Sequence, residues 1–253
     1  AEQAIAKAEA LIAALLATKG EVLEDRLRIS TQRGWEISRL RDVATIRTGI
    51  SKSKERKFKD PLSVPYLRVA NVQDGYLDLK EIKLITIEKD QLARYSLKKG
   101  DVLFNEGGDF DKLGRGCVWS GQITPCVHQN HVFAVRCKPT LNPEFLALLA
   151  ASRRGKAYFR LSSKQTTNLA SINTSDLRSF PVLLPPMNEQ MEIATIASSF
   201  DARVTAEKAS LVRLVEMRAA LVQELLSGRV RLPESIIERH RDKAGPVSYT
   251  HLR

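Results

Sequence analysis

A long amphipathic stretch between two chain-breaking signals most constrains what this chain can fold into. The signals are the proline pair Pro185-Pro186 and Gly228, a residue suited to the position just beyond a helix end. Between them, apolar residues recur with the seven-residue spacing of coiled coils, and Asn188 is expected to cap the helix start. The pattern predicts one continuous helix of about 58 Å, at 1.5 Å per residue. Such a helix needs a partner for its apolar stripe.

The first 29 residues offer that partner. Ile5 and Ile12 have counterparts in Val204 and Leu211 at one constant offset, which suggests an internal repeat. Any two amphipathic helices can, however, be aligned in this way. The residues expected to pair the two helices are Leu16, Leu23, Phe200, Val204, Leu211, Leu214, Leu221 and Leu225. The chain should therefore run from helix to globular insert to helix.

The composition is strongly basic. The 253 residues carry a formal net charge of +11, which favours a polyanionic partner, with nucleic acid first; a basic enzyme with a solvated surface is the alternative. Cys117, Cys126 and Cys137 are odd in number and lack C-x-x-C spacing, which argues for reduced thiols and against a zinc site. No apolar run is long enough to span a membrane and no signal-peptide layout is seen. A soluble, cytoplasmic protein is expected.

The insert has the pattern of an α+β domain rich in short strands. From Trp35 to Ile46 we expect a strand, a turn of helix and a second strand. Further strands are expected at residues 64–69, 82–87, 97–104, 117–119, 132–135 and 180–184, with a helix at 143–157 capped by Asn142. The predicted domains are an N-terminal helix at 1–29, a globular domain at 30–185, a long helix at 186–228 and a basic tail at 229–253.

Residues 105–116 combine glycines with side chains that form hydrogen bonds. In one interpretation Glu106, Asp109 and Asp111 hold Mg²⁺ for phosphodiester hydrolysis. In the second, the side chains read base edges, since Arg or Lys suits guanine, Asn or Gln suits adenine, and an acid accepts from cytosine. In the third, the segment is a structural turn. The lysine and second acid that a nuclease needs in a fixed strand pattern are not found.

Residues 128–131 form a second polar cluster, His-Gln-Asn-His. The histidine spacing is poor for one metal ion at a strand entry, so base-edge contacts are the preferred functional interpretation, with support of the glycine-rich segment as the structural alternative. Together the two clusters give the candidate base-reading residues Asn105, Glu106, Asp109, Asp111, Lys112, Arg115, Gln129 and Asn130.

Basic residues outside these clusters are candidates for contacts with phosphate. Residues 47–60 form a basic loop by composition, and a second basic region surrounds residues 153–167. A solvated surface is the alternative for both. The candidates are Lys52, Lys54, Arg56, Lys57, Lys59, Arg68, Arg153, Arg154 and Lys164.

No motif points to catalysis. Asn142-Pro143-Glu144-Phe145 resembles the Asn-Pro-Pro-aromatic motif of amino-methyltransferases, but the second proline is missing. No glycine-rich loop stands between a strand and a helix, as a nucleotide cofactor would need. No catalytic residue, metal ligand or cofactor is therefore expected in this chain.

Several segments resemble the DNA specificity subunits of type I restriction–modification systems. The exit Ser175-Asp176-Leu177…Phe180-Pro181-Val182…Pro185-Pro186…Glu189-Gln190…Ile193-Ala194 carries most of the likeness. The opening from Trp35 to Gly49, the strand Gly100-Asp101-Val102-Leu103 and the helix end at Leu225-Leu226-Ser227-Gly228 add to it. The resemblance covers about residues 30–232.

The resemblance implies a non-catalytic subunit that reads double-stranded DNA. In this family each target recognition domain reads one half of a bipartite site, and two long helices form a spacer that sets the distance between the halves. Methyltransferase subunits dock on the spacer and methylate adenine with S-adenosylmethionine, and a translocase-nuclease subunit joins them. Only one recognition domain is seen here. The chain is thus either a half-subunit that forms a homodimer through its helices or the second half of a longer chain, and residues 247–253 look like an unrelated tail.

Overall fold

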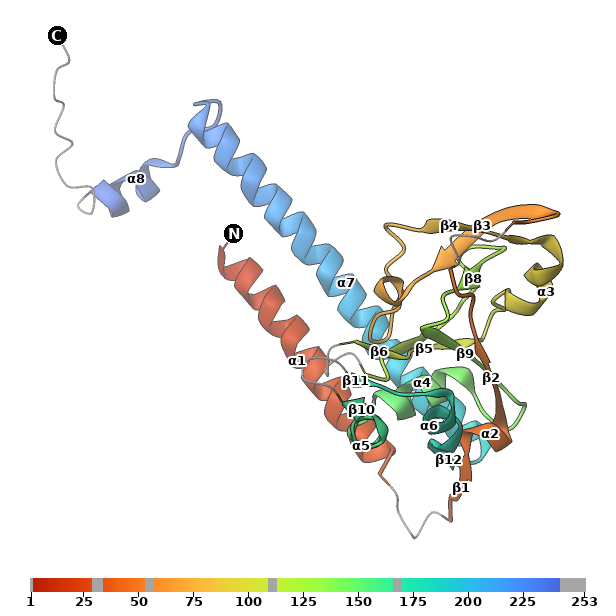
Figure 1. Ribbon diagram of the computed structural model, residues 1–253. Helices are drawn as coiled ribbons and strands as arrows, with labels where there is room; N and C mark the ends of the chain where they lie inside the picture. The colour runs from red at the N-terminus through yellow and green to blue at the C-terminus, as the bar shows by residue number, and fades with distance from the viewer. Residues whose placement is uncertain (1, 29–33, 53–56, 109–112, 166–169, 242–253) are drawn as a thin grey trace. The chain divides into compact units, whose positions relative to one another are not determined.

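The computed structural model describes residues 2–28, 34–52, 57–108, 113–165 and 170–241 (Figure 1). It contains two compact units: Ala1–Ala17 with Phe200–Arg253, and Thr18–Ser199. The boundaries between them fall inside two long helices, α1 (Glu2–Arg26) and α7 (Met187–Leu226). Both helices were predicted. The predicted division of the chain at the helix ends differs from this one, because the last residues of α1 and the first of α7 pack with the globular unit.

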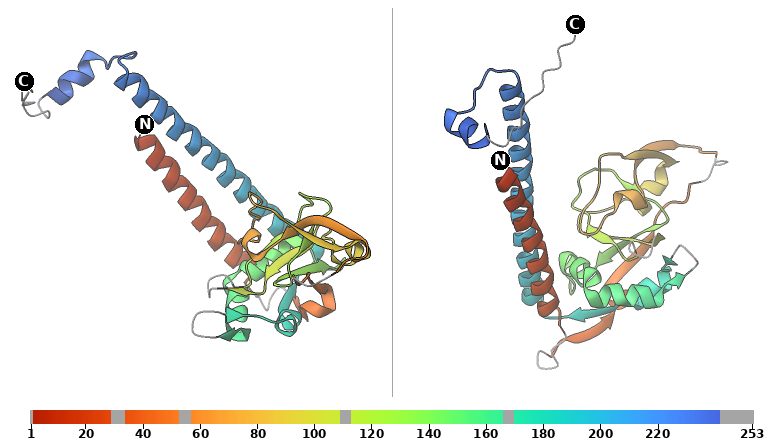
Figure 2. Two further views of the ribbon diagram at one scale, coloured as in Figure 1. Left: turned by 45° about the horizontal axis from the view of Figure 1, so that its top comes forward. Right: turned by 90° about the vertical axis from the view of Figure 1, so that its left-hand side faces the viewer.

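The first unit consists of the start of α1, the later part of α7 and a short helix, α8 (Glu234–Arg241). The two long segments run antiparallel, side by side (Figures 1 and 2). Val204 is buried, and Leu211 and Leu214 are half-buried. The predicted seam needs one correction, because Leu16 and Leu221 are 47% and 48% exposed. The half-buried stripe of α1 in this unit is formed by Ile5, Ala8, Ile12 and Leu15.

The start and end of α7 follow simple backbone rules. The Gln190 N–H donates to the Pro186 carbonyl at 3.1 Å, so the helix starts before Asn188. The prediction that Asn188 caps the helix is therefore wrong, since this residue lies in the first turn. Gly228 has a φ of +72°, as expected for a residue just beyond a helix end.

Gln190 ties the start of α7 to the globular unit. Its side chain is only 1% exposed. The amide nitrogen donates to the carbonyls of Thr140 and Pro185, at 3.0 and 2.9 Å, and the amide oxygen accepts from the Asn142 N–H at 2.8 Å. Neighbouring Glu189 accepts a hydrogen bond from Trp35 Nε1 at 3.2 Å. The exit motif thus closes the unit by satisfying buried backbone groups.

After the end of α1, the second unit continues with the predicted strand, helical turn and strand. These are β1 (Glu36–Arg39), α2 (Leu40–Val43) and β2 (Ala44–Thr48). β1 pairs antiparallel with β12 (Pro181–Leu184), so the first and last strands of the unit lie together. Their pairing brings both ends of the globular unit to the same place, where the long helices leave it.

The central sheet has the order β2-β9-β5-β7 and is antiparallel. Its inner strands are β5 (Val102–Asn105) and β9 (Val132–Cys137), with β7 (Gly116–Val118) at one edge. Successive residues of β5 face different cores: Val102 and Phe104 pack into the main cluster, whereas Leu103 packs into a second one. Because side chains alternate along a strand, the sheet is buried on both faces. This explains the nearly continuous apolar runs of the two strands.

A smaller mixed sheet, β4-β3-β8, has its own core. β3 (Pro61–Leu67) pairs antiparallel with β4 (Lys83–Glu88) and parallel with β8 (Val127–His128). Short helical segments flank these strands: η2 (Val69–Asn71), η3 (Lys89–Gln91) and α3 (Leu92–Tyr95). β3 and β4 were predicted only as separate strands, and β8 was not predicted.

Helices and short strands complete the main core. They are α4 (Pro143–Ala151), α5 (Arg153–Ser162), α6 (Thr174–Ser179), β6 (Gly107–Gly108), β10 (Lys164–Gln165) and β11 (Ala170–Ser171). Asn142 caps α4 as predicted, since its side chain accepts from the Phe145 N–H at 2.9 Å. The single helix predicted at 143–157 is in fact two, because Ser152 ends α4 and its hydroxyl caps α5 through the Gly155 N–H.

The predicted α+β class, with a strand-rich domain between two long helices in the sequence, is confirmed. Cys117 and Cys126 are buried and Cys137 is half-buried, and all are free thiols. Burial raises the pKa of each to about 12, so these thiols stay protonated and unreactive at neutral pH. No helix among the described residues is both long and apolar enough to cross a membrane.

Candidate nucleic-acid interface

Loops that are distant in the sequence converge at one end of the central sheet. β5 ends at Asn105, opposite Val132 of β9. The Glu106 N–H then donates to the His131 carbonyl at 2.9 Å, and the Glu106 carbonyl accepts from the Ile172 N–H at 2.8 Å. We call this region the loop end; it comprises residues 49–52, 67–72, 105–107, 115–116, 128–131 and 170–172.

The smaller sheet joins the loop end through backbone contacts. The Gln129 N–H donates to the Leu67 carbonyl at 2.8 Å, and the Asn130 N–H donates to the Ile50 carbonyl at 3.1 Å. Gly49 permits this approach, because a Cβ at that position would lie 2.0 Å from the carbonyl oxygen of His128. The sequence therefore brings both predicted polar clusters to one surface, as base reading would require.

Asn105 has a structural position within the loop end. It is only 2% exposed, and its amide nitrogen donates to the carbonyls of Val72 and Val69, at 2.9 and 3.4 Å. These bonds hold the segment that follows β3 against the end of β5. The burial argues against a direct contact between Asn105 and a base.

Glu106, His131 and Asn130 form a hydrogen-bonded chain at the surface. Nδ1 of His131 bonds to a carboxylate oxygen of Glu106 at 2.5 Å, and Nε2 of the same ring lies 3.2 Å from the amide nitrogen of Asn130. The side chains of His131 and Glu106 are 55% and 30% exposed. Glu106 and Asn130 were predicted as base-reading residues, whereas His131 was missed, because its role depends on a contact with a residue 25 positions away.

The other candidates divide into described and undescribed residues. Gln129 and Arg115 are half-buried at the loop end. The Arg115 carbonyl accepts from the Asn105 N–H at 2.9 Å, and this residue has further interactions in the structure. Asp109, Asp111 and Lys112 lie outside the described residues. They stay predictions.

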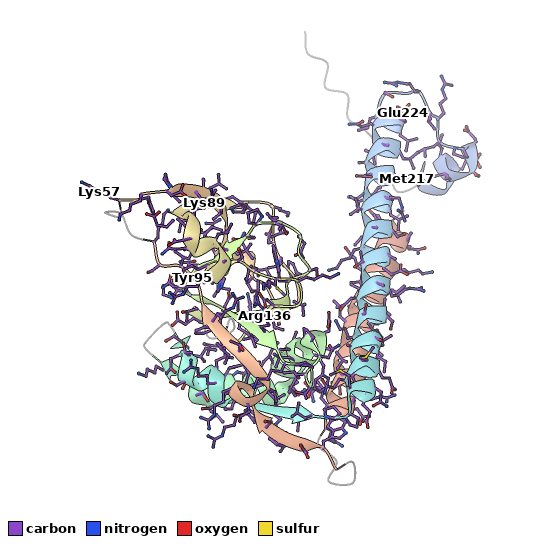
Figure 3. All side chains as sticks on the ribbon, turned by 90° about the vertical axis from the view of Figure 1, so that its right-hand side faces the viewer. Lys57, Lys89, Tyr95, Arg136, Met217 and Glu224 are labelled. Carbon is purple, nitrogen blue, oxygen red and sulfur yellow. The ribbon has the colours of Figure 1, made fainter. Side chains whose placement is uncertain are left out.

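Lysines of the predicted phosphate-contact set stand in solvent. Lys52, Lys57, Lys59 and Lys164 are exposed, and Lys54 and Arg56 lie outside the described residues. The backbone near Lys59 is fixed, because its N–H donates to Glu88 at 2.6 Å. Lys89, which was not predicted, is also exposed (Figure 3), and its N–H donates to the carbonyl of Asp60 in the basic loop at 3.0 Å. The sequence did not indicate Lys89, because only the pairing of β3 with β4 brings this residue close to the basic loop.

Two described arginines of the predicted set are already paired with acids. Arg68 is 25% exposed and lies 3.5 Å from Glu81. Arg153 is paired with Glu21 of α1 at 2.6 Å, and its N–H donates to Glu24. Arg154 is half-buried. Acidic partners already neutralise Arg68 and Arg153, so the exposed lysines are the better candidates for contacts with phosphate.

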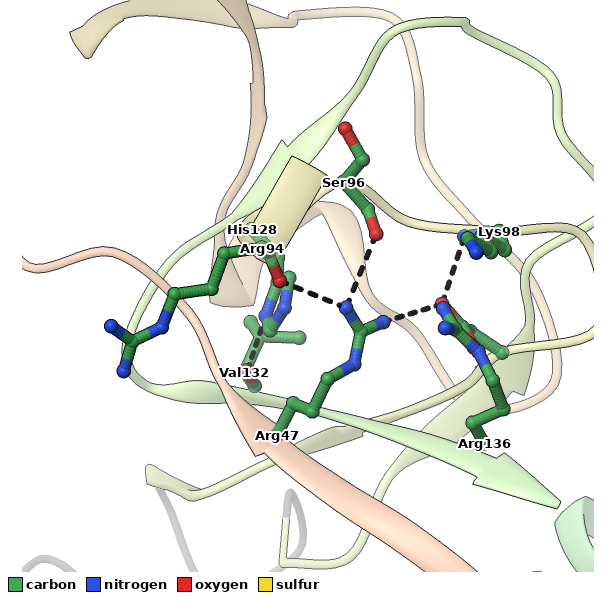
Figure 4. Close-up of polar contacts among 8 residues, drawn as sticks. Arg47, Arg94, Ser96, Lys98, His128, Val132 and Arg136 are labelled. Carbon is green, nitrogen blue, oxygen red and sulfur yellow. Dashed lines mark hydrogen bonds and ion pairs between the residues drawn. The ribbon is translucent and has the colours of Figure 1, made fainter. Parts of the chain in front are cut away.

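A buried charge network lies at the opposite end of β5 (Figure 4). Asp101 is fully buried and bonds to the guanidinium groups of Arg47 and Arg136. Arg47 also donates to the carbonyls of Arg94 and Ser96, at 3.1 and 3.3 Å. Burial lowers the pKa of Arg47, and the attraction of Asp101 opposes this effect. The network fixes the entry to β5 and the segment that precedes it.

His128 is a buried residue that supports the loop end. Its ring is fully buried, and Nδ1 donates to the Val132 carbonyl at 2.7 Å. Burial lowers the pKa of His128 to about 4, so the ring is neutral at physiological pH. Of the two interpretations of residues 128–131, structural support applies to His128. Base contacts stay a prediction for Gln129 and Asn130.

The described residues hold no group of three His, Cys, Asp or Glu side chains that could bind a metal ion. Glu106, one of the three proposed Mg²⁺ ligands, is engaged with His131, and Asp109 and Asp111 lie outside the described residues. The nuclease interpretation gains no support from this geometry.

Fold and site together define an α+β recognition domain that is carried on long helices. The chain belongs to the family of type I restriction modification DNA specificity domains, whose family model matches residues 32–215. It is 28% identical over 185 residues to the putative type I restriction enzyme MjaX specificity subunit of Methanocaldococcus jannaschii, covering 72% of this chain and 41% of that protein.

Two further relatives agree. The EcoKI specificity subunit of Escherichia coli K12 is 27% identical over 157 residues, covering 60% of this chain and 32% of that protein. The HsdS subunit of Thermoanaerobacter tengcongensis has a similar fold, with a TM-score of 0.53 at 17% identity, covering 88% of this chain and 57% of that one. The chain thus spans about half the length of these relatives or less.

Proposed function

We propose that this chain is a DNA-recognition subunit of a type I restriction–modification system and that its globular unit reads one half of a bipartite site. The observation that carries the proposal is the loop end. There, strand pairing brings Glu106, Gln129 and Asn130 from separate loops to one surface, in a chain that matches a DNA specificity family. These side-chain types suit base edges in the major groove.

Exposed lysines supply the second part of the interface. Lys52, Lys57, Lys59 and Lys164 are exposed, and the chain has a net charge of +11. Lysine contacts with phosphate give affinity that does not depend on sequence and that falls with salt. Base selection then rests on the loop end, and the predicted residues Asp109, Asp111, Lys112 and Arg115 complete the candidate set.

The long helices provide the spacer and the docking surface. α7 has 40 residues, or about 60 Å at 1.5 Å per residue. Its later part exposes apolar side chains, among them Val215, Met217, Leu221 and Leu226. Such a surface favours a protein partner, and we assign it to a second copy of this chain and to methyltransferase subunits. A homodimer would supply two recognition domains.

The chain itself carries out no chemistry in this proposal. Adenine methylation belongs to the methyltransferase subunits, which bind S-adenosylmethionine, and cleavage belongs to a translocase-nuclease subunit. The assembly works in the cytoplasm, where the DNA lies.

Selection from a randomised duplex library tests the proposal. The full chain is used alone and with a methyltransferase subunit of its system, and the bound DNA is sequenced. Two identical, inverted half-sites at fixed spacing are expected from a homodimer. A single short half-site would indicate one domain that acts alone, as in part of a longer chain. A bound pool without any enriched motif would overturn the proposal and favour a protein-only adaptor.

A further inference from the structure

The hydrogen-bonded chain at the loop end has a fixed direction. A carboxylate can only accept hydrogen bonds, so Nδ1 of His131 must carry the proton that bonds to Glu106. The amide nitrogen of Asn130 can only donate, so Nε2 of the ring, which lies 3.2 Å from it, accepts this hydrogen bond. The amide oxygen of Asn130 is therefore directed away from the ring.

Two acceptor atoms remain for a ligand. Among the described residues, no hydrogen bond is made by Oδ1 of Asn130 or by Oε1 of Glu106. The two atoms come from different loops, which the backbone bond from Glu106 N–H to the His131 carbonyl holds together. The chain of side chains thus presents two acceptor oxygens, together with the second N–H of the Asn130 amide, on a surface where His131 is 55% exposed.

We propose that His131 is a positioning residue for base recognition and that Glu106 and Asn130, held by its ring, read exocyclic amino groups. The inference rests on the proposed function. In the major groove, the amino groups are N6 of adenine and N4 of cytosine, whereas guanine and thymine present oxygen acceptors in the corresponding place. An oxygen opposite the Glu106 carboxylate is repelled, so the cluster selects adenine or cytosine at the bases that it faces.

The ring also couples the two readers. Loss of the ring releases the Glu106 carboxylate and lets the Asn130 amide turn, so that either its donor or its acceptor meets the base. A substitution at His131 should therefore relax selection at the bases read by both partners, whereas Glu106→Gln, whose amide oxygen can still accept from Nδ1 of His131, should relax only its own base. A merely structural histidine would instead lower affinity for all DNA alike.

The experiment compares library selections by the full chain and its variants Glu106→Gln, His131→Ala and His131→Asn. Glu106→Gln should lose about tenfold of the preference for an amino-bearing base at one position, in line with the weight of one good contact. His131→Ala should relax two positions. His131→Asn keeps an N–H donor toward Glu106 and should restore selection at the Glu106 position. Thr86→Ala, at an exposed site of β4, is the control.

The outcomes separate this inference from the proposed function. In one outcome, the unmodified chain enriches a motif that Glu106→Gln and His131→Ala both retain. This result would overturn the roles assigned to Glu106, His131 and Asn130, but DNA recognition by the chain would stand. A required guanine or thymine at the position that responds to Glu106→Gln would also overturn it. No motif with the unmodified chain would overturn the proposed function and the inference with it. Thermal unfolding of each variant identifies losses that come from misfolding.

Discussion

Asp101 and Arg136 form a two-point ion pair inside the globular unit: Nε and Nη2 of the guanidinium lie 2.8 and 2.7 Å from the two carboxylate oxygens. Arg47 approaches the same carboxylate at 2.8 Å, and the Lys98 N–H donates to it at 2.8 Å. One fully buried acid thus serves two guanidinium groups and a backbone donor. The entry to β5 depends on this single side chain.

Replacement of Asp101 by Ala should destabilise the globular unit by about 3 kcal/mol, because the partly buried guanidinium groups of Arg47 and Arg136 lose their counter-charge. Urea denaturation measures the free energy of unfolding. Asp42→Ala, at an exposed site, is the matched control and should change it little. A loss at Asp101 no larger than at Asp42 would contradict the importance of the network.

His128 should make stability depend on pH. Its pKa falls from 6.5 to about 4 on folding because of burial, so the unfolded chain binds the proton first. Above the unfolded pKa of 6.5, His128 does not reduce the free energy of unfolding. As the pH falls to about 4, the unfolded chain binds the proton, and the loss of stability grows to roughly 3 kcal/mol. Urea denaturation between about pH 7 and pH 4 measures the loss.

A variant separates His128 from the other titrating groups. His128→Asn keeps an N–H donor for the Val132 carbonyl but does not titrate. Its stability deficit relative to the unmodified chain should shrink as the pH falls through this window. A deficit that stays constant from about pH 7 to pH 4 would show that His128 does not titrate in this way.

Two glycines should respond oppositely to alanine. Gly49→Ala places a Cβ 2.0 Å from the His128 carbonyl oxygen and 2.5 Å from that of Gln129, which should destabilise by about 1–3 kcal/mol or more and disturb the loop end. Gly20 of α1 has nothing within 4 Å of such a Cβ, and Gly20→Ala should stabilise by about 1 kcal/mol. Thermal unfolding of both variants is the measurement, and similar shifts for the two would be inconsistent with the close approach at Gly49.

Asn105→Ala should affect stability rather than base selection. Its amide nitrogen serves the carbonyls of Val72 and Val69, and leaving these buried groups unpaired costs about 1–3 kcal/mol. Chemical denaturation and library selection are measured on the same preparation. Relaxed selection at unchanged stability would return Asn105 to the base-reading set.

Lys57→Ala should weaken binding to all duplexes alike and reduce the salt dependence of binding. One phosphate contact fewer lowers the slope of log K against log salt concentration by about 0.9. Binding to a selected and to a random duplex is measured over a range of salt. Lys208→Ala, an exposed lysine of α7, tests whether loss of any positive charge has the same effect, and an equal change in both variants would remove Lys57 from the interface.

Local rules predicted those parts of the fold that depend on neighbours in the sequence. The cap of α4 by Asn142 involves a bond to Phe145, three residues on, and the strands β5 and β9 show as apolar runs. Asn188 failed as a cap although it is a good capping residue, because the Pro186 carbonyl starts the helix before it. The capping preference of Asn188 alone could not show that the helix would already start at the Pro186 carbonyl.

The candidate site depended on contacts that no local pattern contains. The inward direction of Asn105 comes from carbonyls 33 and 36 residues away. Arg47 and Asp101, 54 residues apart in the chain, gave no sign of their pairing. The sequence did indicate both polar clusters at the loop end, since turns rich in Gly, Asn and charged residues mark positions where backbone and side chains meet a ligand. It could not tell a fully buried support such as His128 from a half-buried candidate reader such as Glu106.

Because β5 and β9 are buried on both faces, the two ends of the central sheet are under different constraints as the sequence changes. A substitution within the strands alters a core, and a one-residue shift would exchange the two cores. Exposed side chains beyond the last strand pair, such as that of His131, face no such requirement. Under the proposed function, new DNA specificities therefore need a change of only a few such side chains at the loop end, while the strands that present them stay the same.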